Sequence, residues 1–196
     1  SEILSGLVGS EMCIRDRAII AASKSNLDLK KIFSIIPRLS SVEGRFEKIG
    51  KIKNKSLVFL DYAHTPDALQ TCILNIREQF PDKHISLLFG CGGDRDKGKR
   101  SKMGKIADKY ADKIYLTDDN PRHERPKKIR MEIKRGIKKS QIIEISNRKE
   151  AIAKAINNLN TGNVLIVAGK GHEKIQQIGN RQVSLSDRKI ILSSIR

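Results

Sequence analysis

Residues 56–90 read SLVFLDYAHTPDALQTCILNIREQFPDKHISLLFG, and this stretch predicts the fold. It begins with SLVFLDY, an almost continuously apolar run typical of a strand buried on both faces of a parallel sheet. A helix is expected over 65–80, because Thr65 is a good N-cap, Pro66 suits the first turn, and apolar residues recur at helical spacing. HISLLFG (84–90) then predicts a second strand. A strand, a helix and a strand in succession indicate an α/β fold.

The same alternation continues to the end of the chain. Further helices are expected over 101–111, over 126–139, from Asn147 onward and over 187–196. Further strands are expected over 112–117, 141–146 and 163–169. A hairpin is expected over 174–186, with its turn at Gly179-Asn180. This order predicts a doubly wound, mostly parallel sheet with a C-terminal hairpin, from about Gly44 onward. Before it, the apolar spacing within residues 18–39 predicts a helix pair that is interrupted near Ser25 and Asn26 and ends before Pro37, and residues 40–50 predict a linker.

Composition excludes several classes of protein. With 38% hydrophobic and 31% charged residues and no apolar run of about 20 residues, the 196-residue chain is expected to be globular and not membrane-spanning. Three scattered cysteines favour a reduced cytoplasm and argue against a disulfide scaffold or a zinc cluster. The net charge of +17 suggests nucleic acid as a partner. However, the basic residues are spread along the chain and aromatic residues make up only 4%, so a compositional bias is favoured instead.

Four polar loops follow the predicted strands. They are DYAHTPD (61–67), GCGGDRDKGKR (90–100), TDDNPRHE (117–124) and AGKGHE (168–173). Ligands of doubly wound sheets bind beyond the carboxyl ends of the strands, where these loops are expected to meet. Four loops rich in glycine, charge and histidine at one edge of a sheet predict a ligand site.

The charges in these loops suit a zwitterionic ligand such as an amino acid. Arg122 could hold a carboxylate, whereas Asp119, Asn120 and Glu173 could receive an ammonium. Arg95, in a separate loop, would suit a second carboxylate on the ligand.

Two other features of the loops are less specific. Residues 93–99 match G-x-x-x-x-G-K, but Arg100 follows where a P-loop needs Ser or Thr, so the loop predicts no triphosphate cradle. Arg100, like Arg95, could nevertheless fork onto a carboxylate or a phosphate. Asp61 could accept hydrogen bonds from a ribose, and His64 could contact a nucleotide, although a histidine at a helix entrance is equally often structural.

The ordered motifs GRFE, DYAHTPD, GCGGDRDKGKR, TDDNPR, AGKGHE and SDR resemble the Mur ligases of peptidoglycan synthesis. The resemblance covers about residues 18–196 and is nearest to the branch of the family that adds meso-diaminopimelate to a UDP-N-acetylmuramoyl-dipeptide. It implies a Rossmann-like amino-acid-binding domain of an ATP- and Mg²⁺-dependent ligase that forms an amide bond. A monomeric cytoplasmic bacterial enzyme is expected, with small-molecule substrates and neither nucleic acid nor membrane as a partner.

The resemblance also implies roles for individual residues. The diaminopimelate-binding motif DNPR corresponds to Asp119, Asn120, Pro121 and Arg122, and the pocket would be completed by Arg95, Gly169 and Glu173. Contacts with the nucleotide would come from Arg45, Asp61 and His64. Two departures from the family pattern, Glu43 before GRFE and Ser101 after GKR, fall outside this set.

The resemblance divides the chain into three parts. Residues 44–196 are expected to form the amino-acid-binding domain, and residues 18–43 a remnant of the central ATPase domain. Residues 1–17 contain LVGSEMCIRDR, which reads as the translation of a sequencing adapter and is expected to be an assembly artefact. This sequence contains no true P-loop, so the chain is expected to be inactive alone. Two alternatives are a Mur ligase domain for another amino acid and a free-standing basic module that binds nucleotides or nucleic acid.

Overall fold

The computed structural model describes residues 21–25, 27–35, 42–51 and 55–195. The expected adapter, residues 1–17, lies outside the described residues. In the expected helix pair, residues 21–24 are helical and α2 spans Leu29–Ile35. Neither core cluster of the described residues includes a residue of α2.

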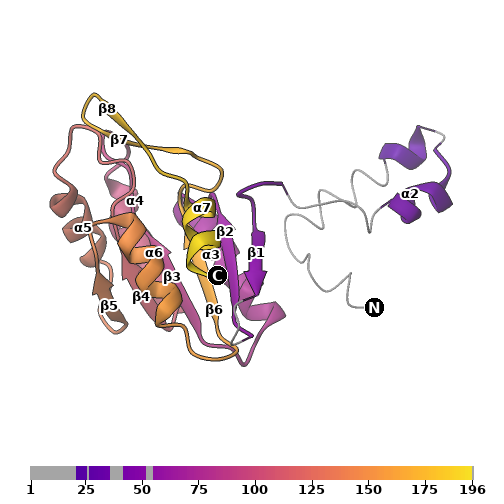
Figure 1. Cartoon of the computed structure of the whole chain (residues 1–196), viewed down its shortest axis with the longest axis horizontal. Coiled ribbons are helices and arrows are strands. Elements are labelled where there is room, and N and C mark those ends of the chain that lie inside the picture. Colours follow the sequence, from indigo (N-terminus) through magenta and orange to yellow (C-terminus); the bar gives the residue numbers. More distant parts are fainter. Residues whose placement is uncertain (1–20, 26, 36–41, 52–54, 196) are drawn as a thin grey trace.

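A six-stranded sheet forms the centre of the domain (Figure 1). Its order is β1-β2-β6-β3-β4-β5, with β1 at Glu47–Lys51, β2 at Leu57–Asp61, β3 at Ile85–Phe89, β4 at Lys113–Leu116, β5 at Gln141–Glu144 and β6 at Val164–Ala168. Strands β2 to β6 run parallel to one another, and β1 pairs antiparallel with β2. The carboxyl ends of the five parallel strands therefore share one edge.

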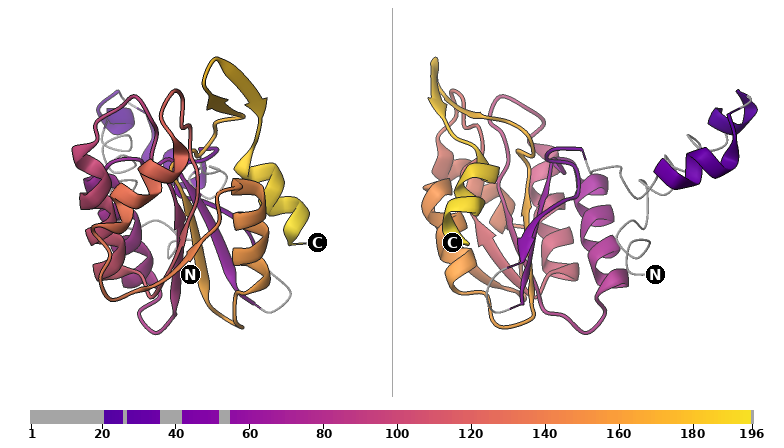
Figure 2. Two further views of the ribbon diagram at one scale, coloured as in Figure 1. Left: turned by 90° about the vertical axis from the view of Figure 1, so that its left-hand side faces the viewer. Right: turned by 45° about the vertical axis from the view of Figure 1, so that its right-hand side comes forward.

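Helices cover both faces of the sheet (Figure 2). The first face carries α3 (Pro66–Gln79), α4 (Gly98–Tyr110) and α5 (Pro126–Lys134), and the second carries α6 (Arg148–Asn157) and α7 (Asp187–Ser194). The doubly wound α/β prediction is therefore confirmed. No helix among the described residues is long and apolar enough to span a membrane.

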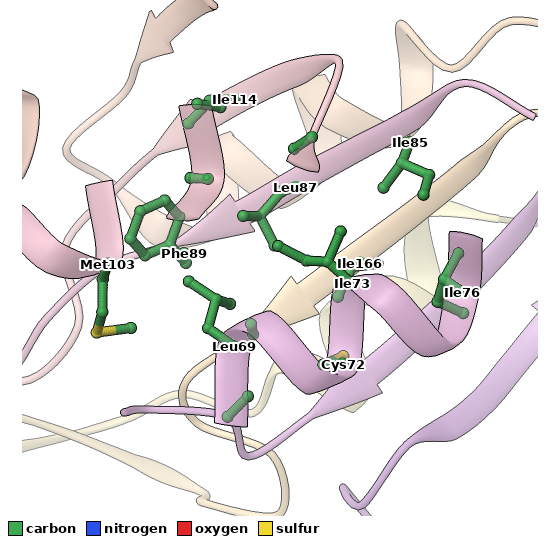
Figure 3. Close-up of a cluster of buried hydrophobic side chains, with 14 of the residues drawn as sticks. Leu69, Cys72, Ile73, Ile76, Ile85, Leu87, Phe89, Met103, Ile114 and Ile166 are labelled. Atoms are coloured by element: carbon green, nitrogen blue, oxygen red, sulfur yellow. The ribbon is translucent and has the colours of Figure 1, made fainter. Parts of the chain in front are cut away.

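Side-chain caps begin α3 and α6 where the sequence predicts them, whereas α4 begins three residues earlier than expected and α5 ends five residues earlier. The Thr65 side chain accepts a hydrogen bond from the Ala68 amide at the start of α3, and Asn147 accepts one from Glu150 at the start of α6. The buried face of α3 consists of Leu69, Cys72, Ile73 and Ile76, which pack with Leu87 and Phe89 of β3 (Figure 3). Cys72 is thus a core residue, as helical spacing indicates.

The expected linker over 40–50 was only partly right, because it contains most of β1. This strand lies at the sheet edge and is irregular between Lys48 and Gly50. Its sequence, EKIGK, has two lysines and a glycine, which are depleted in strands. Its strand conformation depends on pairing with the apolar β2, which local propensity does not reveal.

The expected hairpin is confirmed. It consists of β7 (Ile175–Ile178) and β8 (Arg181–Ser184), with Gly179 at a φ of 56° in the turn. An isolated bridge between Ile178 and Arg122 joins the hairpin to the loop after β4. The hairpin therefore reaches the same edge of the sheet as the four polar loops.

Candidate functional site

A pocket of about 380 Å³ lies at the carboxyl ends of β2, β3, β4 and β6. Its lining combines residues of all four polar loops: Tyr62, His64, Thr65, Gly90, Cys91, Gly92, Arg95, Asp96, Lys99, Asp119, Asn120, Arg122, Gly169 and Glu173. The structure thus brings together Arg95, Asp119, Asn120, Arg122, Gly169 and Glu173, all predicted from sequence. Among the remaining predicted residues, His64 also lines the pocket, whereas Pro121, Arg45 and Asp61 do not.

Asp119 and Asn120 are held rigidly after β4. Asp119 is 8% exposed and Asn120 is 7% exposed. The Asp119 carboxylate accepts a hydrogen bond from the Asn120 amide at 2.6 Å, and the Asp119 carbonyl accepts one from Gln176 Nε2 at 2.6 Å. The first bond, from the Asn120 backbone amide, orients the Asp119 side chain, and further bonds to Lys170, Glu173 and the Gln177 amide orient that of Asn120 before a ligand arrives.

Arg122 has a strained backbone that the hairpin supports. Its φ is 50°, a left-handed conformation that is uncommon for any residue except glycine. The Arg122 amide donates to the Gln177 carbonyl at 3.1 Å, and the Arg122 carbonyl accepts from the Gly179 amide at 2.7 Å. Strain of this kind costs about 1–3 kcal/mol and persists only where the surroundings impose it. The hairpin therefore positions Arg122, a role that the sequence did not reveal.

Pro121 contributes to the shape of the loop and not to the pocket lining. It is buried, and its carbonyl oxygen would overlap a side-chain carbon built on Gly93. The Gly93 amide donates to the Asn120 carbonyl at 2.8 Å, and Arg122 Nη1 donates to the Gly93 carbonyl at 2.8 Å. Two loops thus pack backbone against backbone, which requires glycine at position 93.

Arg95 and Arg100, which looked equivalent in sequence, have different surroundings. Arg95 is exposed at the pocket and, among the described residues, its side chain donates only to the neighbouring Asp94 carbonyl, at 3.3 Å. Arg100 is fully buried and forks onto Glu124 at 2.8 and 3.0 Å, with a further bond to Glu132 at 2.6 Å. Arg100 therefore binds carboxylates of its own chain, and its guanidinium is not available to a ligand.

The glycines of AGKGHE allow close packing beneath the pocket. Gly169 has a φ of 112°, and a side-chain carbon there would approach Asp119 Oδ2 to 2.9 Å. Lys170 is fully buried and donates to Glu173 Oε2 at 2.8 Å and to Asn120 Oδ1 at 2.9 Å. Glu173 itself lines the pocket.

The pocket carries unpaired charge of both signs. Among the described residues, Arg95 and Arg122 form no ion pair, so both guanidiniums are available to anionic groups. Asp119 is likewise without an ion-pair partner in that part of the chain, and Glu173 is satisfied through one oxygen only. This arrangement suits a ligand that carries both carboxylates and ammonium groups.

Two predicted nucleotide contacts lie beside the pocket. The Arg45 guanidinium stacks 4.5 Å from the centre of the Tyr62 ring, which in turn packs at 4.5 Å from the His64 ring. The Asp61 carboxylate accepts from the Phe46 amide at 2.6 Å and from the Ala63 amide at 2.7 Å. Burial raises the pKa of Asp61, whereas these hydrogen bonds act to lower it. Asp61 therefore joins the residues before β1 to the end of β2.

Two further side chains bear on the possible chemistry. Cys91 lines the pocket, but burial raises the pKa of its thiol to about 12, so it remains protonated and is no nucleophile. Lys99, at the start of α4, donates to the His64 carbonyl at 2.8 Å and so fixes the loop after β2. The described residues include no group of three or more His, Cys, Asp or Glu side chains that could hold a metal ion.

Comparisons with known proteins identify the family and the fold of the chain. Residues 44–171 match the family model described as Mur ligase, glutamate ligase domain. A relative named UDP-N-acetylmuramoyl-L-alanyl-D-glutamate–2,6-diaminopimelate ligase, from Rickettsia felis (strain ATCC VR-1525 / URRWXCal2), is 46% identical over 172 residues. That alignment covers 86% of this chain and 32% of the relative, so the chain spans about a third of the length of the curated relatives it matches.

Solved structures show the same fold. A structure titled UDP-N-acetylmuramoyl-L-alanyl-D-glutamate–2,6-diaminopimelate ligase aligns with a TM-score of 0.73 and 36% identity, covering 91% of this chain and 36% of that one. A MurF ligase from Thermotoga maritima in complex with ADP aligns with a TM-score of 0.56 and 21% identity, covering 90% of this chain and 35% of that one. The second likeness supports the fold alone.

Proposed function

This chain belongs to the Mur ligase family, and we propose that it is the domain that binds meso-diaminopimelate in a ligase of peptidoglycan synthesis. The complete ligase would join this amino acid to UDP-N-acetylmuramoyl-L-alanyl-D-glutamate in the bacterial cytoplasm. ATP would activate the glutamate carboxylate as an acyl phosphate, which the amine of diaminopimelate would attack. Residues 18–43 would belong to the neighbouring ATPase domain, and residues 44–196 would form the amino-acid-binding domain.

The observation that carries this proposal is that two arginines and two carboxylates line one pocket, and that neither arginine forms an ion pair among the described residues. Diaminopimelate has a carboxylate and an ammonium at each end. Arg95 and Arg122 would bind carboxylates, and Asp119 and Glu173 would bind ammonium groups. Asn120 has one side-chain N–H without a partner among the described residues, which could donate to a ligand oxygen.

Arg122 would provide selectivity against lysine. Lysine has the same ammonium groups but lacks the second carboxylate of diaminopimelate. Bound in this pocket, it would leave Arg122 without an anionic partner and near the distal ammonium of the ligand. A desolvated charge left in this way costs about 2–5 kcal/mol, which corresponds to a preference of about 30-fold or more.

The nucleotide would be bound largely outside this chain. Arg45 is exposed and has no ion-pair partner among the described residues, so it fits a contact with a phosphate oxygen. Asp61 could accept a ribose hydroxyl, because each carboxylate oxygen retains a lone pair beyond its bond to a backbone amide. His64 would approach the same ligand from the rim of the pocket. ATP and Mg²⁺ would be held mainly by the ATPase domain.

Isothermal titration calorimetry of this chain tests the amino-acid assignment. We expect meso-diaminopimelate to bind more tightly than lysine, and Arg122→Ala to remove that preference. The matched control is Arg125→Ala, because Arg125 is an exposed arginine three residues away that does not line the pocket. Equal binding of the two amino acids by the unmodified chain would refute the proposed role of Arg122.

A further inference from the structure

Lys170 is a buried cation directly beneath the pocket. It lies between Gly169 and Gly171, both at positive φ, and its side chain is 0% exposed. Its ammonium donates to Glu173 Oε2 at 2.8 Å and to Asn120 Oδ1 at 2.9 Å. A buried charge is stable only when paired and hydrogen-bonded, so Lys170 constrains the groups around it. Because it does not line the pocket, it would act on a ligand only through those groups.

The first consequence is a fixed orientation of the Asn120 amide. Asn120 Oδ1 accepts from Lys170 Nζ and from the Gln177 amide at 3.0 Å, which uses both of its lone pairs. Both of these groups are donors only, so the amide oxygen must face them and the amide nitrogen must face Glu173. Asn120 Nδ2 then donates to Glu173 Oε2 at 3.0 Å.

The second consequence is that the two oxygens of Glu173 become different. Glu173 Oε2 accepts from both Lys170 and Asn120, whereas Oε1 has no hydrogen-bond partner among the described residues. The Glu173 side chain is 29% exposed and lines the pocket. Oε2 is therefore held by Lys170 and Asn120, and Oε1 remains available to a ligand.

We propose that Lys170 is a positioning residue that fixes Glu173 and Asn120 so that Glu173 Oε1 faces an ammonium group of the bound amino acid. This inference rests on the proposed function. The Lys170 charge also offsets the repulsion between Glu173 and the nearby Asp119 carboxylate before a ligand binds. Without Lys170, Glu173 would rotate toward water, and the ligand would have to order it on binding.

A double-mutant cycle tests this role, with meso-diaminopimelate affinity measured by calorimetry. Lys170→Met is expected to weaken binding by about 10-fold or more, because a misplaced contact group is costly. In a Glu173→Gln background the same change is expected to have an effect of less than about two-fold, because the Gln177 amide still orients Asn120 and Lys170 acts on the ligand through Glu173. An equal loss in both backgrounds, with an unchanged thermal midpoint, would overturn the proposal.

A second measurement needs no variant. In the unmodified chain, the ¹⁵N resonance of the Lys170 ammonium is expected to exchange slowly with water and to shift when meso-diaminopimelate binds. Exchange as fast as that of surface lysines would overturn the inference. If the unmodified chain binds no amino acid, the proposed function fails. If it binds normally and Lys170→Met binds equally well, only the role of Lys170 fails.

Discussion

His123 Nδ1 lies 2.7 Å from Asp94 Oδ2, and this contact joins the loops that carry the two free arginines of the pocket. Asp94 precedes Arg95, and His123 follows Arg122. On its other side, His123 Nε2 lies 3.1 Å from Asn180 Oδ1 in the hairpin turn. The loop that carries Arg95, the loop that carries Arg122 and the hairpin turn therefore meet at the His123 side chain, which can gain or lose a proton.

The contact predicts a pH dependence of these loops. Hydrogen bonds to Asn180 and Asp94 raise the pKa of His123, because only the protonated ring donates to both. The folded-state pKa lies above the unfolded value of 6.5, so the stabilisation is complete below about pH 6.5 and is lost as the pH rises through the folded pKa. Nuclear magnetic resonance titration should show a raised His123 pKa, and hydrogen exchange near residues 94 and 180, corrected for intrinsic rates, should increase above it.

Asp94 sets the lower limit of the pH range in which its contact with His123 is stabilising. The hydrogen bond from His123 lowers the pKa of Asp94, so the contribution of the carboxylate is present above its unfolded pKa of 3.8 and is lost as the pH falls through the folded value. His123→Ala should abolish the change in exchange at alkaline pH. A His123 ring that titrates at its ordinary value would contradict the prediction.

The ion pair between Arg148 and Asp187 should contribute strongly to the stability of the fold. Both side chains are 0% exposed, and Arg148 donates to both carboxylate oxygens, at 2.7 to 3.1 Å, and to the Ala168 carbonyl at 2.9 Å. Asp187→Ala leaves a buried guanidinium without its counterion, so we expect a loss of about 3–5 kcal/mol in the free energy of unfolding, measured with urea. The control is Lys134→Ala, which breaks a partly exposed pair with Glu144 while Arg130 still holds that carboxylate. Similar losses in both variants would contradict this view.

Much of the pocket could be predicted because its position follows from local signals. Apolar runs identify the strands, the parallel order sends their carboxyl ends to one edge, and the loops there carry the charges. Arg95, Asp119, Arg122 and Glu173 could therefore be named before the structure was known. Their joint lining of one pocket is now observed, whereas their roles in binding stay predictions.

The features of the pocket that the sequence did not predict depend on contacts between residues that are far apart in the chain. The left-handed backbone of Arg122 is fixed by Gln177 and Gly179, and no local pattern around DNPR announces that partnership. Arg100 is different, because a usable signal existed. Arg100, Met103 and Ala107 recur at helical spacing and form part of the buried face of α4, so the periodicity favoured a buried arginine.

Gly93 should tolerate no side chain. Gly93→Ala would bring a methyl group against the Pro121 carbonyl and push the two loops apart. We expect a destabilisation of about 1–3 kcal/mol from this overpacking, together with weaker binding of meso-diaminopimelate. Thermal unfolding and calorimetry would measure the two effects. The matched control is Gly98→Ala in the first turn of α4, where the added carbon would lie 3.1 Å from the movable Asp96 side chain. A Gly93→Ala variant as stable as Gly98→Ala would contradict the close packing of the loops.

Arg45 should separate nucleotide binding from amino-acid binding. Its guanidinium stacks on Tyr62 outside the pocket and forms no ion pair within the described part of the chain. In the complete ligase, Arg45→Ala should raise the KM for ATP by about 10- to 150-fold, the effect of losing one charge-assisted hydrogen bond of about 1.5–3 kcal/mol, and leave the KM for meso-diaminopimelate unchanged. Arg122→Ala should show the opposite pattern, because Arg122 lines the pocket. If Arg45→Ala instead changes the KM for the amino acid alone, Arg45 contacts the amino acid and not the nucleotide.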